Sequence, residues 1–506
     1  MKYDKYSRER RAVPALRAIM RDYWLAGVFF AVIAIVLYLC YPEPYLTSDS
    51  GEYMNSAVRL ANNPYRPLGY GLFLALVHTV FSSAQVIPFA QMLVYLLGLS
   101  YFVRQIHHTF ALSRRTIMVL SILLVINPLP WLYTMHILSD SLFTTLTLCF
   151  VGSAVSYAHD AAPRTLMQML IWAGLSLLVR HVGLLYMIFG AAVIIFKWKK
   201  NFFKPLIGFA AGCALVILLI CFKMNADLGV FRLNTFDGWT LYGTAARYID
   251  LSPEYRDRIS SSELKQLYDY FASYPETTYT SHSRDWNQWS PDSPAKRLLF
   301  YYIQTYRMDY YQAWVVANDN LRQIATDIVF HRPSAYFMGS YLPALANGIW
   351  PDMILQEGGW PGYPFYPKPS PPDKTIQSYY HQNTETWNAQ FDVFPVIKPM
   401  IDIWVKPLMP LFIIITITTV LRRGKLNLFA ELPPVVVLGG FVVFYIVSVA
   451  ATIYLYTRFL VPITSLLITL NVIGAVRAFQ FQRNGYRPPI FSLNRRELVK
   501  NGKESQ

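Results

Sequence analysis

Long apolar runs separated by short basic segments make up most of this chain. The first run, residues 23–41, is about 20 residues long, which is enough for a helix to cross a bilayer. Because cytoplasmic loops carry the excess of Lys and Arg, the basic segments place both termini inside. The pattern predicts about ten spans, at residues 23–41, 85–103, 116–133, 141–157, two within 165–198, 205–222, 401–421, 433–453 and 459–475.

Two segments refine this topology. Residues 165–198 would be roughly 50 Å long as one helix, against a hydrocarbon core of about 30 Å. Since both ends of this run are basic, we predict two short spans that turn at Arg180 and His181 on the external side. Residues 67–81 are short and open with Pro and Gly, so they predict an interfacial helix in the first external loop.

The predicted fold class is therefore mainly α, a polytopic membrane helical bundle with interfacial helices and an external, mixed but largely helical domain. Residues 224–400 are polar and aromatic, with helical patterns near 261–271 and 294–330. Pro-rich segments follow at 360–372. We divide the chain into an N-terminal transmembrane catalytic module, the external domain, C-terminal spans and a basic cytoplasmic tail, at residues 1–223, 224–400, 401–478 and 479–506.

The charge distribution supports this division. Only 15% of the residues are charged, against roughly 25% in a typical soluble protein. Residues 224–400 hold 14 Lys and Arg against 18 Asp and Glu, while the whole chain carries +15. The basic excess thus lies in the short loops and tails, which is typical of cytoplasmic loops and does not indicate a nucleic-acid groove. The chain has no Asn-x-Ser/Thr acceptor site, which favours a bacterial inner membrane, with the external face in the periplasm.

Ionisable residues collect at the predicted external face. Asp49 and Glu52 follow the first span within the sequence Ser-Asp-Ser-Gly-Glu-Tyr. Charged residues at span ends are often only interfacial anchors, but two acids at separate turns together with three arginines are unusual on the Arg-poor side. The residues that we predict to meet there are Asp49, Glu52, Tyr53, Arg66, His136, Asp140, Arg180, His181 and Arg458.

Glycosyl transfer from a lipid phosphate fits these residues. Asp49 can act as general base and take the proton of an acceptor hydroxyl. Arginines can hold the phosphate leaving group through charge-assisted hydrogen bonds, which assigns that role to Arg66, Arg180 and Arg458. Asp140 is a supporting acid or a metal ligand. We assign substrate contacts to Glu52, Tyr53, His136 and His181, with a loop cap or a simple hydrogen-bonded histidine as the alternatives.

Two acids do not make a metal site, so no metal residues are predicted, and a divalent cation stays an open alternative. The segment 236–244 follows a span and can either touch a sugar acceptor or pack its own domain; we favour packing.

The order of four short motifs carries a resemblance. Asp49 is followed by Tyr53, and Arg66-Pro67 opens the interfacial helix. The other motifs are HILSDSLF at 136–143, LVRHVGL at 178–184 and YLYTRFLVP at 454–462. In this order and topology the chain resembles the GT-C glycosyltransferases, in particular the aminoarabinose transferases of lipid A and the protein O-mannosyltransferases.

The resemblance implies an inverting transfer from a polyprenyl-phosphate sugar on the external face. The acceptor is then a lipid-linked glycan, lipid A or another envelope acceptor, with a protein as the alternative. The resemblance covers roughly the first 200 and the last 100 residues. At two positions the chain departs from the aminoarabinose transferases, because Glu52 stands in place of an Arg and Tyr65 in place of a metal-linked Glu. The sugar and any metal therefore stay open.

Two other functions compete with the enzyme. A transporter or flippase of lipid-linked saccharides should carry polar groups near mid-bilayer, whereas the predicted spans are nearly free of charge. A non-catalytic envelope assembly protein would explain the external domain but would leave both acids without a role. We therefore predict an enzyme whose partners are the polyprenyl-phosphate sugar, its acceptor and membrane lipids, without nucleic acid.

Overall fold

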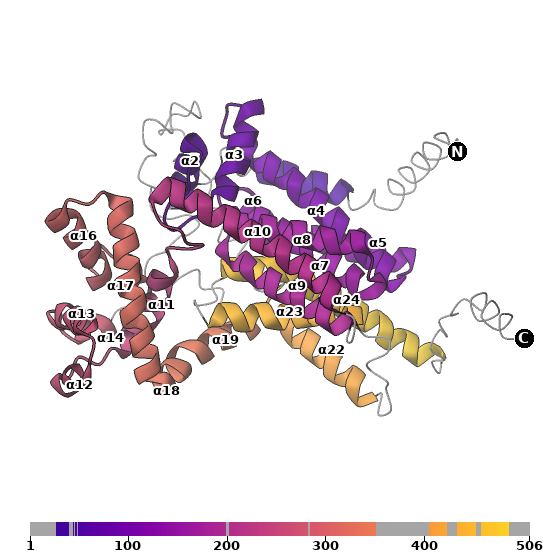
Figure 1. Cartoon of the computed structure of the whole chain (residues 1–506). Helices are drawn as coiled ribbons and strands as arrows, with labels where there is room; N and C mark the ends of the chain where they lie inside the picture. Colours follow the sequence, from indigo (N-terminus) through magenta and orange to yellow (C-terminus); the bar gives the residue numbers. More distant parts are fainter. Residues whose placement is uncertain are drawn as a thin grey trace, which may run out of the picture.

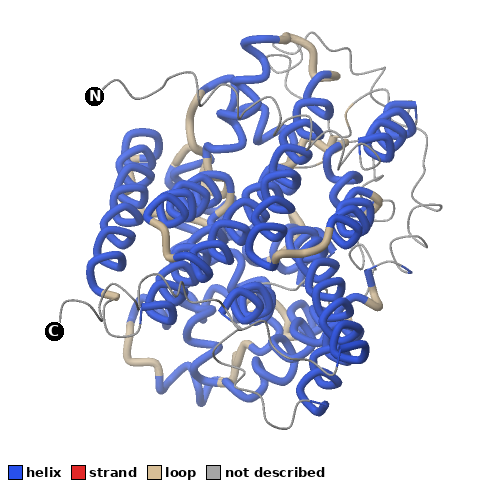
Figure 2. The backbone as a smooth tube through the Cα atoms, turned by 90° about the vertical axis from the view of Figure 1, so that its right-hand side faces the viewer, coloured by secondary structure: helices blue, strands red, loops and turns tan. Residues whose placement is uncertain are grey.

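The computed structural model describes residues 27–39, 44, 46–47, 49–198, 202–281, 284–350, 403, 405–422, 433–451 and 457–484. This part of the chain is mainly helical and holds no β-strand, as the tube in Figure 2 shows. A single isolated bridge pairs Asn63 with Arg66. The predicted Pro-rich segment 360–372 and nearly all of the basic tail lie outside the described residues.

The larger part of the molecule is a helical bundle, seen centre and right in Figure 1. Its helices are α3 (Leu68–Val80), α4 (Val86–Phe110), α5 (Arg114–Val125), α6 (Pro128–Thr134), α7 (Ser139–Asp160), α8 (Pro163–Val179), α9 (Leu184–Trp198), α10 (Phe203–Leu228), α22 (Leu408–Arg422), α23 (Pro433–Ala450) and α24 (Thr457–Asn484). Helix α7 is central, because it packs on α4, α8, α23 and α24 and 94% of its most apolar window is buried. Helix α10 is peripheral, with only 22% of its window buried, so its apolar side chains face outwards.

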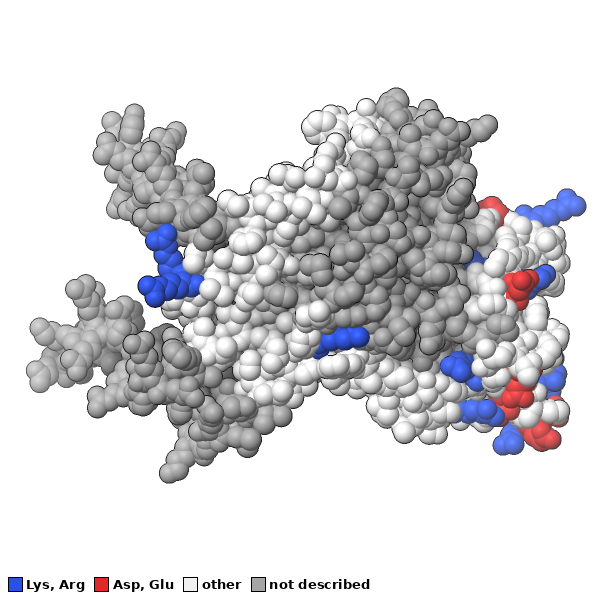
Figure 3. All heavy atoms as spheres, turned by 180° about the vertical axis from the view of Figure 1, so that it is seen from behind, with Lys and Arg blue, Asp and Glu red and all other residues white. Residues whose placement is uncertain are grey.

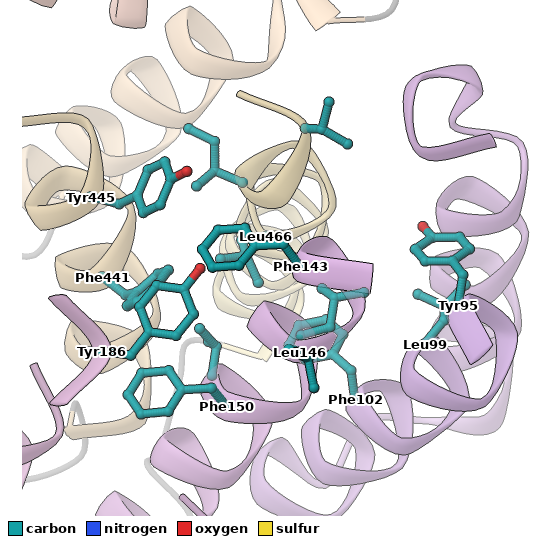
Figure 4. Close-up of a cluster of buried hydrophobic side chains, with 14 of the residues drawn as sticks. Tyr95, Leu99, Phe102, Phe143, Leu146, Phe150, Tyr186, Phe441, Tyr445 and Leu466 are labelled. Carbon is teal, nitrogen blue, oxygen red and sulfur yellow. The ribbon is translucent and has the colours of Figure 1, made fainter. Parts of the chain in front are cut away.

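Several buried hydroxyl groups of α7 bond to backbone carbonyls of the same helix. Thr144 and Thr147 each donate to the backbone carbonyl four residues earlier, at 2.8 Å. The Thr147 hydroxyl also lies 2.6 Å from the Tyr186 hydroxyl of α9. The Tyr186 ring sits 5.0 Å from Phe150 and 5.3 Å from Phe441 of α23, in the cluster of Figure 4. Helices from both ends of the sequence are therefore joined through one aromatic core.

Four described helices are long and apolar enough to cross a membrane, namely α4, α7, α10 and the 459–476 part of α24. A fifth candidate is the pair α5 and α6, which bend by 47°. The span that we predicted at 116–133 corresponds to this pair, so it is broken into two helices. Asn127 caps α6 by accepting from the Leu129 N–H, and Pro128 at the first position cannot donate a helical hydrogen bond, so the first helix ends before them.

The turn predicted within 165–198 is present. Helix α8 ends at Val179, a single 3₁₀ turn spans His181–Gly183, and α9 begins at Leu184. Two glycines allow backbones to meet here. An added Cβ at Gly69 would lie 2.4 Å from the Leu178 carbonyl oxygen, and one at Gly183 would lie 2.3 Å from the Leu177 nitrogen. Helix α3 thus rests directly on the end of α8.

Gly69→Ala is expected to lower the free energy of unfolding by about 1–3 kcal/mol, because the new methyl group must push backbone rather than a flexible side chain. Denaturant or thermal unfolding of the purified protein in detergent measures this. Gly208→Ala in α10 is the matched control, since an added Cβ there meets nothing within 4 Å. Equal stability of both variants would show that α3 and α8 do not approach this closely.

A second domain, which we call the α11–α19 domain, lies at the left of Figure 1. It has its own aromatic core, formed by Trp239, Tyr268, Phe271 and Trp314 among others. Its helices are α11 (Asp237–Ala245), α12 (Pro253–Arg258), α13 (Ser262–Ala272), α14 (Thr277–Thr280), α15 (Arg284–Trp289), α16 (Pro294–Tyr306), α17 (Tyr310–His331), α18 (Pro333–Tyr336) and α19 (Leu342–Ile349).

Two sequence boundaries need correction here. The predicted start of the external domain at residue 224 falls inside α10, which continues to Leu228 and ends at Gly229. The helical pattern at 294–330 is two helices, because Arg307 adopts a left-handed conformation (φ 52°) and Asp309 caps α17. In Figure 3 charged side chains of both signs gather over the α11–α19 domain, whereas the middle of the molecule shows almost none among the described residues.

Candidate functional site

The sequence predicts a loop at residues 42–66, but part of this first external segment is helical. Helix α2 (Ser50–Arg59) begins directly after Asp49 and carries Glu52 in its first turn. The Ser50 Oγ donates to the Ile137 carbonyl at 2.9 Å. The Tyr53 hydroxyl and the Ser139 Oγ are hydrogen-bonded at 2.8 Å. The start of α2 is therefore fastened to the start of α7, which brings Asp49 next to the turn that carries Asp140.

Arg66 forms an ion pair with Asp49, with 2.8 Å between Nη2 and Oδ1. Its guanidinium also lies 5.7–5.8 Å from the ring centres of Tyr53, Tyr65 and Phe236. The Asn63 side-chain oxygen shapes the loop by accepting from the Arg66 N–H at 2.6 Å. The pair thus joins α2 to the segment that leads into α3.

The loop that carries Arg66 is tied to both domains. The Asn62 N–H donates to Asp227 at the end of α10, at 2.7 Å. The Thr235 hydroxyl donates to the Pro64 carbonyl, and Tyr65 belongs to the aromatic core of the α11–α19 domain. The consecutive asparagines before Pro64 were the sequence signal for this shaped loop, since Asn side chains often satisfy local backbone groups.

The second acid, Asp140, forms an ion pair with Arg180. We predicted a turn through Asp140, but α7 already begins at Ser139, so the carboxylate lies in the first helical turn. The positive end of the helix dipole favours a carboxylate at this position. Asp140 is only 1% exposed, and Arg180 lies over the rings of Phe143 and Phe459 at 5.5 and 5.3 Å. This is a buried ion pair walled by aromatic faces.

His181 lies within electrostatic reach of the arginines of both ion pairs. Burial lowers the pKa of this imidazole to about 4, and the positive charges of Arg66 and Arg180 act in the same direction. Asp237 and the backbone of Leu233 act in the opposite direction. Arg66, Arg180 and Asp237 are therefore all within electrostatic reach of one ring, and His181 is neutral at ordinary pH.

The thermal midpoint of the wild type is expected to fall more steeply than that of His181→Gln between pH 6.5 and 4. Because the pKa of His181 is about 4 in the folded chain and about 6.5 when unfolded, the unfolded chain binds more protons in this window. Acid therefore favours unfolding of the wild type. Unfolding scans at several pH values measure this, with the exposed His107→Gln as control. Parallel curves for wild type and His181→Gln would contradict the prediction.

Glu52 and Tyr65 interact with each other. Burial raises the pKa of the Tyr65 hydroxyl, and its hydrogen bond to the Glu52 carboxylate adds to this. Glu52 also accepts from the Asn63 amide at 3.3 Å. Through Tyr65, which belongs to the core of the α11–α19 domain, Glu52 thus connects the site to that domain.

His136 lies shortly before α7. His136 is fully buried, its Nδ1 lies 2.7 Å from the Leu132 carbonyl oxygen, and its own carbonyl accepts from Gln91. These are packing contacts, and its role with a substrate stays a prediction. The side chain of Arg458 lies outside the described part, but its neighbour Phe459 contacts Arg180, so α24 begins at the site.

Sequence reasoning missed Asp237 as a member of the site. It opens α11, accepts from the Asn318 amide at 3.0 Å, and acts electrostatically on His181. In the segment 236–244, Trp239 and Tyr242 are completely buried, which agrees with the prediction that this segment packs its own domain. Phe236 is half-buried and faces Arg66. In the sequence, the only sign of this role was that Asp237 follows the span predicted at 205–222.

Among the described residues no three His, Cys, Asp or Glu side chains are grouped so as to hold a metal ion. Compared with protein-family models, curated proteins and solved structures, the chain matches none of them. The geometry of the site therefore has to carry any functional assignment.

Proposed function

We propose that this chain is an integral membrane glycosyltransferase that moves a sugar from a polyprenyl-phosphate donor to a lipid-linked glycan, lipid A or another envelope acceptor. One observation carries the proposal. Asp49 and Asp140 come from distant segments that hydrogen bonds hold together at one end of the bundle, and each carboxylate is paired with an arginine. A site with two acids and two fixed cations suits a reaction that takes up one proton and releases a phosphate.

In the proposed reaction Asp49 is the general base. The acceptor oxygen attacks the anomeric carbon on the face opposite the phosphate, and its proton passes to the Asp49 carboxylate. The bond between the anomeric carbon and the phosphate oxygen breaks, and polyprenyl phosphate leaves with the bonding electrons. One displacement inverts the anomeric configuration. As Asp49 loses its charge, its ion pair with Arg66 weakens, and the Arg66 guanidinium turns to the leaving phosphate.

Asp140 has a supporting role in this scheme. It holds the Arg180 guanidinium in place between Phe143 and Phe459, so that this cation need not reorganise when charge develops on the phosphate. The neutral His181, within electrostatic reach of both arginines, can donate or accept a hydrogen bond without adding a third positive charge.

The full topology is part of the proposal. Ten spans are obtained when the five candidates above are joined by α22, the helix Gly27–Leu39, α8, α9 and α23, which are apolar but shorter. Helix α3 is then the interfacial helix of the first external loop. On this arrangement the protein lies in the inner membrane and the site faces the periplasm, next to the α11–α19 domain.

Purified protein in lipid, supplied with radiolabelled polyprenyl-phosphate sugars and a series of acceptors, tests the activity. Release of polyprenyl phosphate together with labelled acceptor supports the proposal, and the labelled product separates a glycan or lipid acceptor from a protein acceptor. Donor binding without release across all acceptors would contradict it and would favour a transporter of lipid-linked saccharides.

A further inference from the structure

A lysine of the α11–α19 domain is enclosed by indole rings. Lys296 lies in the first turn of α16, and its Nζ is 5.2, 5.3 and 4.8 Å from the ring centres of Trp239, Trp289 and Trp314. These rings come from α11, α15 and α17. Trp239 and Trp314 are stacked, with 4.2 Å between centres. Cation–π contacts of this kind stabilise an ammonium group but occupy none of its three N–H donors.

The Lys296 ammonium makes no ion pair or hydrogen bond with the residues that the structure describes. Both site arginines are already paired with acids, whereas this cation is not. Burial lowers the pKa of Lys296 to about 8, and the Glu52 carboxylate opposes this shift. A half-buried cation with three unused donors is costly for folding alone, because burial of a charge needs compensation.

The enclosed lysine and the proposed reaction centre belong to one continuous aromatic wall. Phe236 lies 5.7 Å from the Arg66 guanidinium and 5.6 Å from Trp289. Tyr65 lies 4.6 Å from Trp314. Glu52 acts electrostatically on Lys296 as well as on Tyr65. The wall thus leads from the Asp49–Arg66 pair to Lys296.

The rim of the wall is open. Trp289 is 38% exposed and Tyr310 is 39% exposed, although both are large aromatic side chains within a domain that has its own core. Exposed aromatic faces next to hydrogen-bonding groups suit rings that present one apolar and one polar side, as sugars do.

We propose that Lys296, with Trp289, Phe236 and Tyr310 beside it, binds an anionic group borne on a saccharide ring of the substrate. This inference rests on the proposed function for the identity of the substrates. The anion is either the phosphate of the polyprenyl-phosphate sugar or a phosphate on a sugar of the acceptor. In both cases the lysine donates hydrogen bonds to the anion while a sugar ring stacks on the exposed aromatic faces.

The charge of Lys296 sets the pH dependence of this binding. Below about pH 8 the ammonium is charged and attracts the anion, and above it the attraction is lost. Glu52 on α2 acts electrostatically on Lys296, and Tyr65 and Tyr310 contact the Trp314 ring that lies against the ammonium. Arg66 lies further along the wall, at Phe236. Burial raises the pKa of Tyr65 and raises that of Tyr310 to about 12, so neither tyrosine loses its proton near pH 8.

Direct binding to the full-length protein tests the proposal without any need for turnover. The probes are a polyprenyl-phosphate sugar, polyprenyl phosphate alone, and a soluble phosphorylated oligosaccharide as acceptor analogue. The variants are Lys296→Met and Lys296→Arg, with Lys265→Met on α13 as a matched surface control. Unfolding midpoints of all variants show whether the domain is intact.

We expect Lys296→Met to weaken binding of one phosphate-bearing probe by about 10–100-fold, because a charge-assisted hydrogen bond is lost. Lys296→Arg should keep most of the affinity, and its affinity should not decrease between pH 7 and 9 as that of the wild type does. Loss for both polyprenyl probes assigns the site to the donor, and loss for the oligosaccharide alone assigns it to the acceptor. Unchanged affinity for every probe with an intact domain would overturn the inference, whereas failure of transfer alone would overturn only the proposed function.

Discussion

Asp49→Asn is expected to lower the rate of glycosyl transfer by about 10²–10⁴-fold, the range attributed to general base catalysis. Asparagine has the same shape and keeps an oxygen that can accept from Arg66, but it cannot take the acceptor proton. Binding of the polyprenyl-phosphate sugar should therefore change little. Single-turnover release of polyprenyl phosphate, measured together with donor binding, separates these two effects.

Asp292→Asn is the control for this substitution, because Asp292 is an exposed acid of the α11–α19 domain that pairs with the nearby Arg297. It should transfer sugar at the wild-type rate. If Asp49→Asn also kept that rate, Asp49 would be an anchor for Arg66 and the base would have to be sought elsewhere. If Asp49→Asn lost donor binding instead, its carboxylate would serve to position Arg66 for the phosphate.

Asp140→Ala is expected to destabilise the protein by about 3–5 kcal/mol, the usual cost of removing one partner from a buried ion pair. The remaining Arg180 guanidinium is only 12% exposed and has aromatic faces on two sides, so water cannot replace the lost carboxylate. Chemical unfolding of the purified protein in detergent measures the loss. The effect should be larger than that of Gly69→Ala.

A double-mutant cycle with Arg180→Met tests whether the unpaired Arg180 causes the loss of stability in Asp140→Ala. Because the double variant buries no unpaired charge at this position, its loss of stability should be smaller than the sum of the two single losses. Additive losses would show that Asp140 and Arg180 are stabilised independently, each by other neighbours. Transfer activity of the double variant should remain low even where its stability recovers.

The turn at Arg180 and the fastening of Asp49 near Asp140 follow from simple sequence features. A bilayer has a fixed thickness, so a run of 34 apolar residues flanked by basic residues at both ends had to turn, and its charged centre marked the place. Charges that collect at span ends on one side must then approach one another when the helices pack. Apolar length and charge position were sufficient for these predictions.

Other features depend on contacts that no local pattern records. The sequence showed three arginines and two acids, but not that Arg66 and Arg180 each take one acid as a partner. The bend between α5 and α6 depends on a single capping residue inside an apolar run. Lys296 is 244 residues from Glu52 in the sequence, so only tertiary packing reveals their proximity.

Through the loop before α3, the Asp49–Arg66 ion pair connects the helical bundle to the α11–α19 domain. Its Pro64 and Tyr65 are held by the α11–α19 domain, whereas Asp49 is held by the start of α7 through Ser50. A displacement of that domain relative to the bundle would therefore change the distance between the cation and the carboxylate. A change in this distance would alter how far Arg66 covers the Asp49 carboxylate, so the position of the α11–α19 domain bears on how accessible that acid is.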